Sequence, residues 1–154
     1  MNLSINFHLD RSMPGTSRRK SRELAVKLIY SRDRLNDTNE MEHLIHPDTH
    51  QGKDTDKFAN ELTETAWNNL VAIDEMIQKN LKNWKQHRIS PVLNAILRIS
   101  IGEILFYQKT DGKVILNEAI ELCKSLVGEQ ATKICNGVLH AVWTTKNSEI
   151  TKET

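Results

Sequence analysis

A run of basic residues near the amino terminus is the part of this sequence best suited to contact a charged partner. Arg18, Arg19, Lys20 and Arg22 lie within five consecutive positions, immediately before the apolar positions of an expected helix. Residues 1–34 carry a formal charge of +5, and the rest of the chain carries −4. Clustered cations attract a polyanion because each phosphate contact releases condensed counterions. The local charge therefore indicates a nucleic-acid partner, which the near-neutral total of +1 conceals.

The same helix offers two hints about which nucleic acid it would bind. Cations at the start of a helix oppose the helix dipole, so their presence there suggests a partner that supplies negative charge. No recognition-helix arrangement for duplex DNA is evident, whereas a flexible arginine-rich arm can become ordered on single-stranded RNA. RNA is therefore the preferred ligand. Tyr30, further along this helix, could stack on a base or pack at the edge of the core, and packing is the commoner outcome for such a tyrosine.

A histidine cluster is the first of the alternatives. His43, His46 and His50, with Asp48, have spacings that resemble a set of metal ligands. They lie in a polar segment in which Pro47 interrupts any shared helix face. A solvated loop is the expected structure, and we expect neither a metal nor another cofactor.

Charged residues in the second half of the chain have structural explanations. Asn117, Glu118 and Glu121 lie near the start of an expected helix, where acids suit the helix dipole without any catalytic role. Arg98 interrupts an apolar helix, and a buried charge must be paired or reach solvent. We expect Arg98 to pair with Glu118 or Glu121. No phosphate-binding glycine loop, nucleophile elbow or clustered metal ligands occur, so an enzyme is not expected.

Composition favours one helical domain of a cytoplasmic protein. A chain of 154 residues can bury roughly 70% of its unfolded surface, and its six glycines and three prolines are few. No apolar run approaches the roughly 18 residues that cross a bilayer, and no secretory signal is recognisable at the amino terminus. Cys123 and Cys135 fall within apolar helical patterns. We therefore expect reduced core thiols rather than a disulfide or a redox role.

Apolar spacing predicts helices throughout the chain and strands nowhere. The class is all-α, and short connections would make successive helices antiparallel neighbours. Residues 1–15 are expected to be a flexible extension, residues 16–145 the domain, and residues 146–154 a flexible tail. The first predicted helix runs from Thr16 or Arg18 to Asp33, and a short one is expected near 39–45, in the polar segment 36–53. A long helix is predicted at 54–83, with an N-cap in Asp54-Thr55-Asp56. The last three are predicted at 91–108, beginning at Ser90-Pro91, at 114–127 and at 129–144.

The pair Asn136-Gly137 is the strongest short hairpin signal, but its surroundings argue against a hairpin. The neighbouring apolar residues follow the helical period without a break. Gly137 inside a helix costs about 1 kcal/mol relative to alanine. We expect the compensation to be the close approach of a neighbouring backbone near Gly102.

Three stretches, taken in order, resemble the NusB family of transcription antitermination proteins. They lie between about residues 18 and 143 and comprise Arg18–Tyr30, Ala95–Ile104, and Ile115–Lys124 followed by Asn136-Gly137-Val138-Leu139. The resemblance implies a NusB-like fold of about seven helices in two packed sub-bundles. It implies an RNA-binding antitermination factor rather than an enzyme.

The resemblance also implies partners and site residues. The ligand would be single-stranded boxA RNA of ribosomal RNA transcripts, bound together with NusE, a small-subunit ribosomal protein, within an antitermination complex on RNA polymerase. Arg18, Arg19, Lys20 and Arg22 would form the arginine-rich RNA-binding arm, with Tyr30 as the aromatic at the end of that segment. The helices predicted at 114–127 and 129–144 would add to the RNA-binding side. Some family members are dimers that cover this side, so the resemblance also allows a homodimer.

Two other functions remain open from the sequence. One is a helical module that binds a ribosomal protein without binding RNA. The other is a fragment of an enzyme, because a NusB-like domain precedes the catalytic domain of some ribosomal RNA methyltransferases. The chain ends soon after Trp143, so we expect no cofactor-binding sheet.

Overall fold

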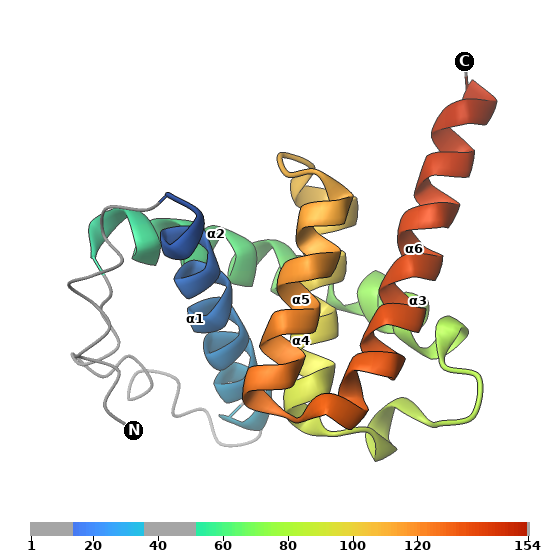
Figure 1. Ribbon diagram of the computed structural model, residues 1–154, viewed down its shortest axis with the longest axis horizontal. Helices are drawn as coiled ribbons and strands as arrows, with labels where there is room; N and C mark the ends of the chain where they lie inside the picture. Colours follow the sequence, from blue (N-terminus) through green and yellow to red (C-terminus); the bar gives the residue numbers. More distant parts are fainter. Residues whose placement is uncertain (1–13, 36–51, 154) are drawn as a thin grey trace. The chain divides into compact units, whose positions relative to one another are not determined.

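The computed structural model describes residues 14–35 and 52–153, and this part of the chain contains six α-helices and no strand (Figure 1). The prediction of an all-α protein is therefore confirmed. The short helix expected near 39–45 lies outside the described residues. The chain divides into two compact units, residues 1–63 and 64–154. Over the described ranges, every helix is too short or too polar to cross a membrane.

The first unit contains α1 (Pro14–Leu35) and most of α2 (Lys53–Asn68). The apolar spacing of this helix predicted a buried stripe of Leu24, Ala25, Leu28 and Ile29. Three of these residues are buried, as is Val26, whereas Leu28 is partly exposed. Ser17 Oγ and Thr55 Oγ1 are hydrogen-bonded at 3.2 Å, which links the first turns of the two helices. The Asp56 N–H donates to Gly52 O, so α2 begins ahead of the predicted cap, and Asp54 and Asp56 lie in its first turn instead.

The prediction of a single helix at 54–83 is wrong, because the helix is interrupted at Asn69. There α2 ends and α3 (Leu70–Asn80) begins. Asn69 has φ −120° and ψ 24°, and its side-chain amide donates to Thr65 O at 2.8 Å. An asparagine side chain that bonds to a nearby carbonyl offers the backbone an alternative to the helix. The apolar period continues through the break, which is why spacing alone did not reveal it.

The helix predicted from Ser90-Pro91 forms as expected. Ser90 Oγ accepts the N–H of Leu93, and Pro91 is the first residue of α4 (Pro91–Gly102). The helix contacts α3 and both helices that follow, α5 (Gly112–Leu126) and α6 (Thr132–Glu153), so it is the centre of the second unit (Figure 1). All its residues from Ala95 onward are buried.

A π-helical turn, Glu103–Tyr107, continues α4 to the predicted end. The Gln108 N–H donates to Glu103 O five residues back, and Gln108 has a positive φ of 57°. Such a turn leaves carbonyls without their usual partners. Lys146 Nζ, from α6, donates to Ile104 O at 2.6 Å and satisfies one of them.

The carboxy-terminal helices follow the predicted order. Asp111 caps α5 by accepting the Lys113 N–H at 2.9 Å. Gly128 has φ 143° and separates α5 from a short 3-10 turn, Glu129–Ala131. The last helix, α6, continues to Glu153, beyond residue 144 where the prediction ended it. Asn136-Gly137 lies inside α6, so rejection of the hairpin is confirmed.

The prediction that a neighbouring backbone approaches Gly137 closely is wrong. The close approach of a backbone occurs at Gly102 instead. A Cβ at Gly137 would meet nothing within 4 Å. A Cβ at Gly102 would lie 3.3 Å from both Cα and Cβ of Ala66. Gly102 therefore lets α4 pack closely against the end of α2, whereas Gly137 is an exposed glycine in a helix.

We expect Gly137→Ala to raise the free energy of unfolding by about 0.5–1 kcal/mol, because alanine is the better helix former and nothing obstructs its methyl group. Gly102→Ala is expected to lower it by about 1 kcal/mol through overpacking. Urea denaturation of both variants measures the difference. Equal gains at the two sites would contradict the close contact at Gly102.

Arg98 is paired with a residue that the sequence did not indicate. Its Nε and one terminal nitrogen donate to the two carboxylate oxygens of Asp74, each at 2.9 Å. Arg98 is 8% exposed, and the Asp74 side chain 30%. Gln86 Nε2 also donates to Asp74 at 2.8 Å. The bidentate pair thus joins α4 to α3, whereas the partners predicted for Arg98 were Glu118 and Glu121 of α5.

We expect Asp74→Ala to lower the free energy of unfolding by about 2 kcal/mol, because it removes the bidentate partner of a buried guanidinium. Glu75→Ala, at the neighbouring exposed position, is the matched control and should change stability by less than about 0.5 kcal/mol. The measurement is again urea denaturation. Similar small effects of both substitutions would show that the pair does not stabilise the second unit.

The two cysteines form a buried pair of thiols. Cys123 of α5 and Cys135 of α6 are both free and fully buried, in agreement with the predicted core thiols. A hydrogen bond with the Cys123 thiol, together with burial, raises the pKa of Cys135, and the same interaction lowers the pKa of Cys123. Because the thiolate is the reactive form, Cys135 is held in its unreactive state.

Candidate nucleic-acid interface

The four predicted site cations lie within a formed helix. Because α1 begins at Pro14, Arg18 is its fifth residue, and its first turn contains no acidic residue. The helix dipole acts mainly within the first turn. The argument that these cations oppose the dipole is therefore wrong, since the helix begins earlier than predicted. Residues 18–22 are also part of a regular helix, and not of a flexible arm.

The four cations differ in exposure. Arg18 and Arg19 are exposed, Lys20 is partly exposed, and Arg22 is only 5% exposed. Arg22 therefore belongs to the packed side of α1. A phosphate that approaches from solvent can reach the first three residues directly, whereas Arg22 can act only through its neighbours.

Phe58 of α2 holds two of these arginines. The Arg18 guanidinium carbon lies 4.2 Å from the centroid of the Phe58 ring, and that of Arg22 lies 5.5 Å from it. The ring itself is 6% exposed. A guanidinium stacked on an aromatic face keeps N–H donors around its edge. Phe58 can thus position the exposed Arg18 without neutralising its charge.

The role of Phe58 was not predicted from the sequence, although a clue to it was present. Arg18 and Arg22 are four residues apart, so they lie on the same face of α1. Acids and aromatic rings can both lie opposite two such arginines. Which of these α2 supplies depends on how the two helices pack, and the sequence alone does not give that.

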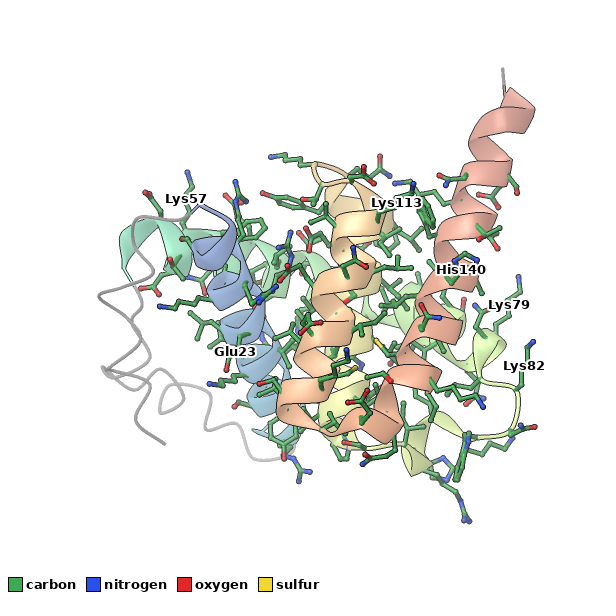
Figure 2. The ribbon with its side chains drawn as sticks, viewed as in Figure 1. Glu23, Lys57, Lys79, Lys82, Lys113 and His140 are labelled. Carbon is green, nitrogen blue, oxygen red and sulfur yellow. The ribbon has the colours of Figure 1, made fainter. Side chains whose placement is uncertain are left out.

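Tyr30 lies near the other end of α1. It is partly exposed, and the Arg34 guanidinium carbon lies 4.7 Å from the centroid of its ring. Glu23 and Lys27, one and two turns before it, form an ion pair at 3.3 Å. Figure 2 shows Glu23 on α1 and Lys57 on α2 within the first unit. Lys57 is exposed and precedes Phe58 in α2.

The remaining candidates give no clear chemical site. Among residues 14–35 and 52–153, no group of three or more histidine, cysteine, aspartate or glutamate side chains could hold a metal ion. His43, His46, Asp48 and His50 lie outside this part of the chain. The resemblance also assigned RNA contacts to α5 and α6, which belong to the second unit.

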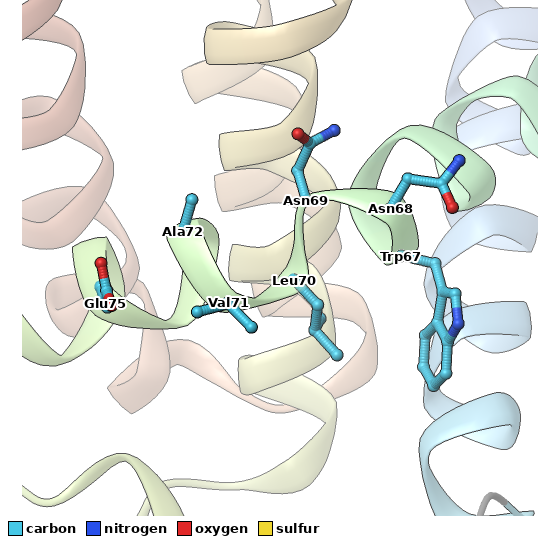
Figure 3. A pocket seen from close by; sticks show the side chains of 7 residues that line it. All are labelled: Trp67, Asn68, Asn69, Leu70, Val71, Ala72 and Glu75. Carbon is cyan, nitrogen blue, oxygen red and sulfur yellow. The ribbon is translucent and has the colours of Figure 1, made fainter.

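A pocket of about 390 Å³ lies at the break between α2 and α3 (Figure 3). Its seven lining residues are apolar or amide side chains apart from one acid; they are Trp67, Asn68, Asn69, Leu70, Val71, Ala72 and Glu75. Val71 is 76% exposed. A lone carboxylate among apolar and amide groups offers no nucleophile paired with a base, so the pocket suits contact with another molecule better than catalysis.

A helical domain with a cationic first helix is typical of proteins that bind nucleic acids through preformed surfaces. Comparison with known proteins shows the family to which this chain belongs. The NusB family model matches residues 19–143, and the chain belongs to this family. The transcription antitermination protein NusB of Bacillus cereus strain B4264 is 36% identical over 124 residues, which cover 79% of this chain and 93% of the relative.

Solved structures agree with this assignment. NusB from T. maritima superimposes with a TM-score of 0.72 and 28% identity, covering 82% of this chain and 90% of that one. A crystal structure of the antitermination factors NusB and NusE in complex with double-stranded RNA contains a chain with a TM-score of 0.73 and 26% identity. That match covers 84% of this chain and 98% of the other.

We expect Arg22→Gln to lower the free energy of unfolding by about 1–2 kcal/mol, because a buried guanidinium loses its contact with Phe58 and its packed stem. Arg19→Gln, which removes an exposed charge from the same run, should change stability by less than about 0.5 kcal/mol. Urea denaturation distinguishes the two. A small change in the free energy of unfolding for both variants would show that Arg22 contributes no more to stability than an exposed cation does.

Proposed function

We propose that this protein is a non-catalytic RNA-binding antitermination factor that recognises boxA-type RNA of ribosomal RNA transcripts together with NusE. Its relatives are named as transcription antitermination proteins, and one similar solved structure combines NusB, NusE and RNA. The observation that carries the proposal is the exposed cationic start of α1 in a chain of this family. The proposal that it lacks catalysis rests on the antitermination role of that family.

The structure supports separate roles for the proposed site residues. Arg18, Arg19 and Lys20 are accessible and suit direct contacts with phosphates. Arg22 is a positioning residue, because it is buried beside the ring on which Arg18 stacks. Tyr30 is partly exposed and suits contact with a base.

Phosphate contacts fix the position of a nucleic acid but do not read its sequence. Preference for boxA must therefore come from contacts to bases, either on the helical body or on NusE. We infer that NusE sharpens selectivity, whereas α1 supplies affinity. Action on a nascent transcript at RNA polymerase would place the protein in the cytoplasm, and the oligomeric state that the resemblance allows can be measured by sedimentation.

A protein-binding module without RNA binding is the second candidate. It is favoured by exposed apolar side chains in the second unit, which include Val71, Trp84, Phe106 and Val114. Val71 also lines the pocket between α2 and α3, where an apolar group of a partner could be buried (Figure 3). Under this alternative the protein would bind NusE but no RNA, alone or in the complex.

We expect Arg18→Ala/Arg19→Ala/Lys20→Ala to weaken binding to single-stranded boxA RNA and to reduce the slope of log K against log salt concentration by about 2, since each phosphate contact contributes about 0.7. Gel shifts at several salt concentrations, with and without NusE and with scrambled RNA, measure both quantities. Circular dichroism confirms that the variant remains folded. A double-stranded RNA of the same sequence shows which form is preferred.

A triple variant of exposed cations in the second unit, Lys79→Ala/Lys82→Ala/Arg88→Ala, is the matched control and should keep nearly the full slope. Figure 2 shows Lys79 and Lys82 at the end of α3 and just beyond it. Identical slopes for the wild type and the α1 variant would rule out the proposed site. Binding of NusE without any binding of RNA would favour the second candidate.

A further inference from the structure

We propose that the RNA surface of α1 continues past the arginine-rich run to the other end of the helix, where Lys27 contacts a phosphate and the Arg34 guanidinium, stacked on Tyr30, provides a platform for a base. The proposal rests on the RNA binding inferred above and adds residues to the same helix. Neither Lys27 nor Arg34 is among the RNA-binding residues that the resemblance implies.

The burial pattern divides α1 into two sides. One side is closed to solvent, with Ala25 and Ile29 at 0% exposure. The opposite side carries residues separated by three or four positions, which places them in one row along the helix. All of them are partly or fully exposed; they are Lys20, Glu23, Lys27, Tyr30 and Arg34.

This row is long enough for several nucleotides. A rise of 1.5 Å per residue puts Lys20 and Arg34 about 21 Å apart along the helix axis. Lys20 belongs to both the arginine-rich run and this row, whereas Arg18 and Arg22 lie on the side of α1 that contacts Phe58, so the two surfaces meet at Lys20. A ribonucleotide chain that follows α1 from this run would pass over Lys27 before it reached Tyr30 and Arg34.

Lys27 has a partner that a phosphate can replace. It pairs with Glu23 at 3.3 Å, and the Lys27 side chain is 38% exposed. An ion pair at that exposure is weak and is screened by salt. A phosphate brings a full negative charge to the same ammonium group, and the flexible lysine stem allows Lys27 to turn toward it.

Arg34 determines how a base can stack at Tyr30. Its guanidinium lies over the Tyr30 ring, 4.7 Å from the centroid, so that face of the tyrosine is already covered. Arg34 is itself exposed. Bases stack on guanidinium planes as well as on aromatic rings. The exposed Arg34 guanidinium is therefore the group that a base meets on this side of Tyr30, and its charge also attracts the neighbouring phosphates.

A simpler explanation exists for the charge of Arg34. Arginine in the last turn of a helix is favourable to the helix dipole, and Arg32 occupies the same turn. That explanation requires a positive charge but not a planar one, and it says nothing about Lys27 in the middle of the helix. Substitution by lysine, which keeps the charge and loses the plane, separates the two explanations.

The experiment compares Lys27→Gln, Arg34→Gln and Arg34→Lys with the wild-type protein. Each is titrated with single-stranded boxA RNA and with inorganic polyphosphate of equal phosphate number, which has no bases. Arg34→Lys should weaken RNA binding about tenfold while leaving polyphosphate binding and the salt slope unchanged. Lys27→Gln should weaken both ligands and reduce the salt slope by about 0.7. Arg34→Gln should combine the two effects.

Arg88→Gln, an exposed arginine of the second unit, is the control for loss of one charge. Thermal melting of each variant excludes a loss of fold. If the wild type binds RNA and all three α1 variants match Arg88→Gln, this second contact is overturned and the proposed function stands. If Arg34→Lys equals the wild type on RNA, the stacking platform is overturned. Failure of the wild type to bind RNA overturns the proposed function itself.

Discussion

The contact of Arg18 with the ring of Phe58 is the interaction on which the candidate interface depends. A cationic surface must hold its charges in place while leaving them available to a ligand. A carboxylate would hold an arginine firmly but would cancel its charge. The face of an aromatic ring attracts the cation through its quadrupole and leaves the net charge unchanged. The Arg18 guanidinium carbon lies 4.2 Å from the centroid of the Phe58 ring, and Arg18 remains exposed.

The central helix of the second unit needs stabilising contacts of another kind. It carries the buried charge of Arg98, a close backbone contact at Gly102 and a π-helical turn. The bidentate pair with Asp74 compensates the desolvation of Arg98, while Gly102 permits close contact with Ala66. Lys146 satisfies a carbonyl of the π-helical turn that follows. Each device joins α4 to a different helix. The central helix is thus fixed by specific contacts as well as by apolar burial, which by itself does not determine register.

The sequence predicted the elements of this fold better than their partners. Helical spacing identified α1, α4, α5 and α6 because each buries one stripe or is buried all round. It missed the break at Asn69, where a side-chain hydrogen bond competes with the helix while the apolar period continues. It also did not indicate Asp74 as a partner of Arg98, and it gave the wrong place for the close backbone approach. Both depend on which helices meet, and the spacing within one helix carries no such information.

In the candidate site too, the sequence predicted which residues cluster but not how their side chains are arranged. The cluster at residues 18–22 was visible in the sequence, but the burial of Arg22 and the stacking of Arg34 on Tyr30 were not. A flexible arm would lose about 1–2 kcal/mol of backbone entropy for each residue that a ligand orders. Residues 18–22 are already helical, so a ligand that contacts them avoids this cost. A preformed helix also fixes the spacing between its cations. Spacing of this kind favours one path of the phosphate chain over others, which a flexible arm cannot do.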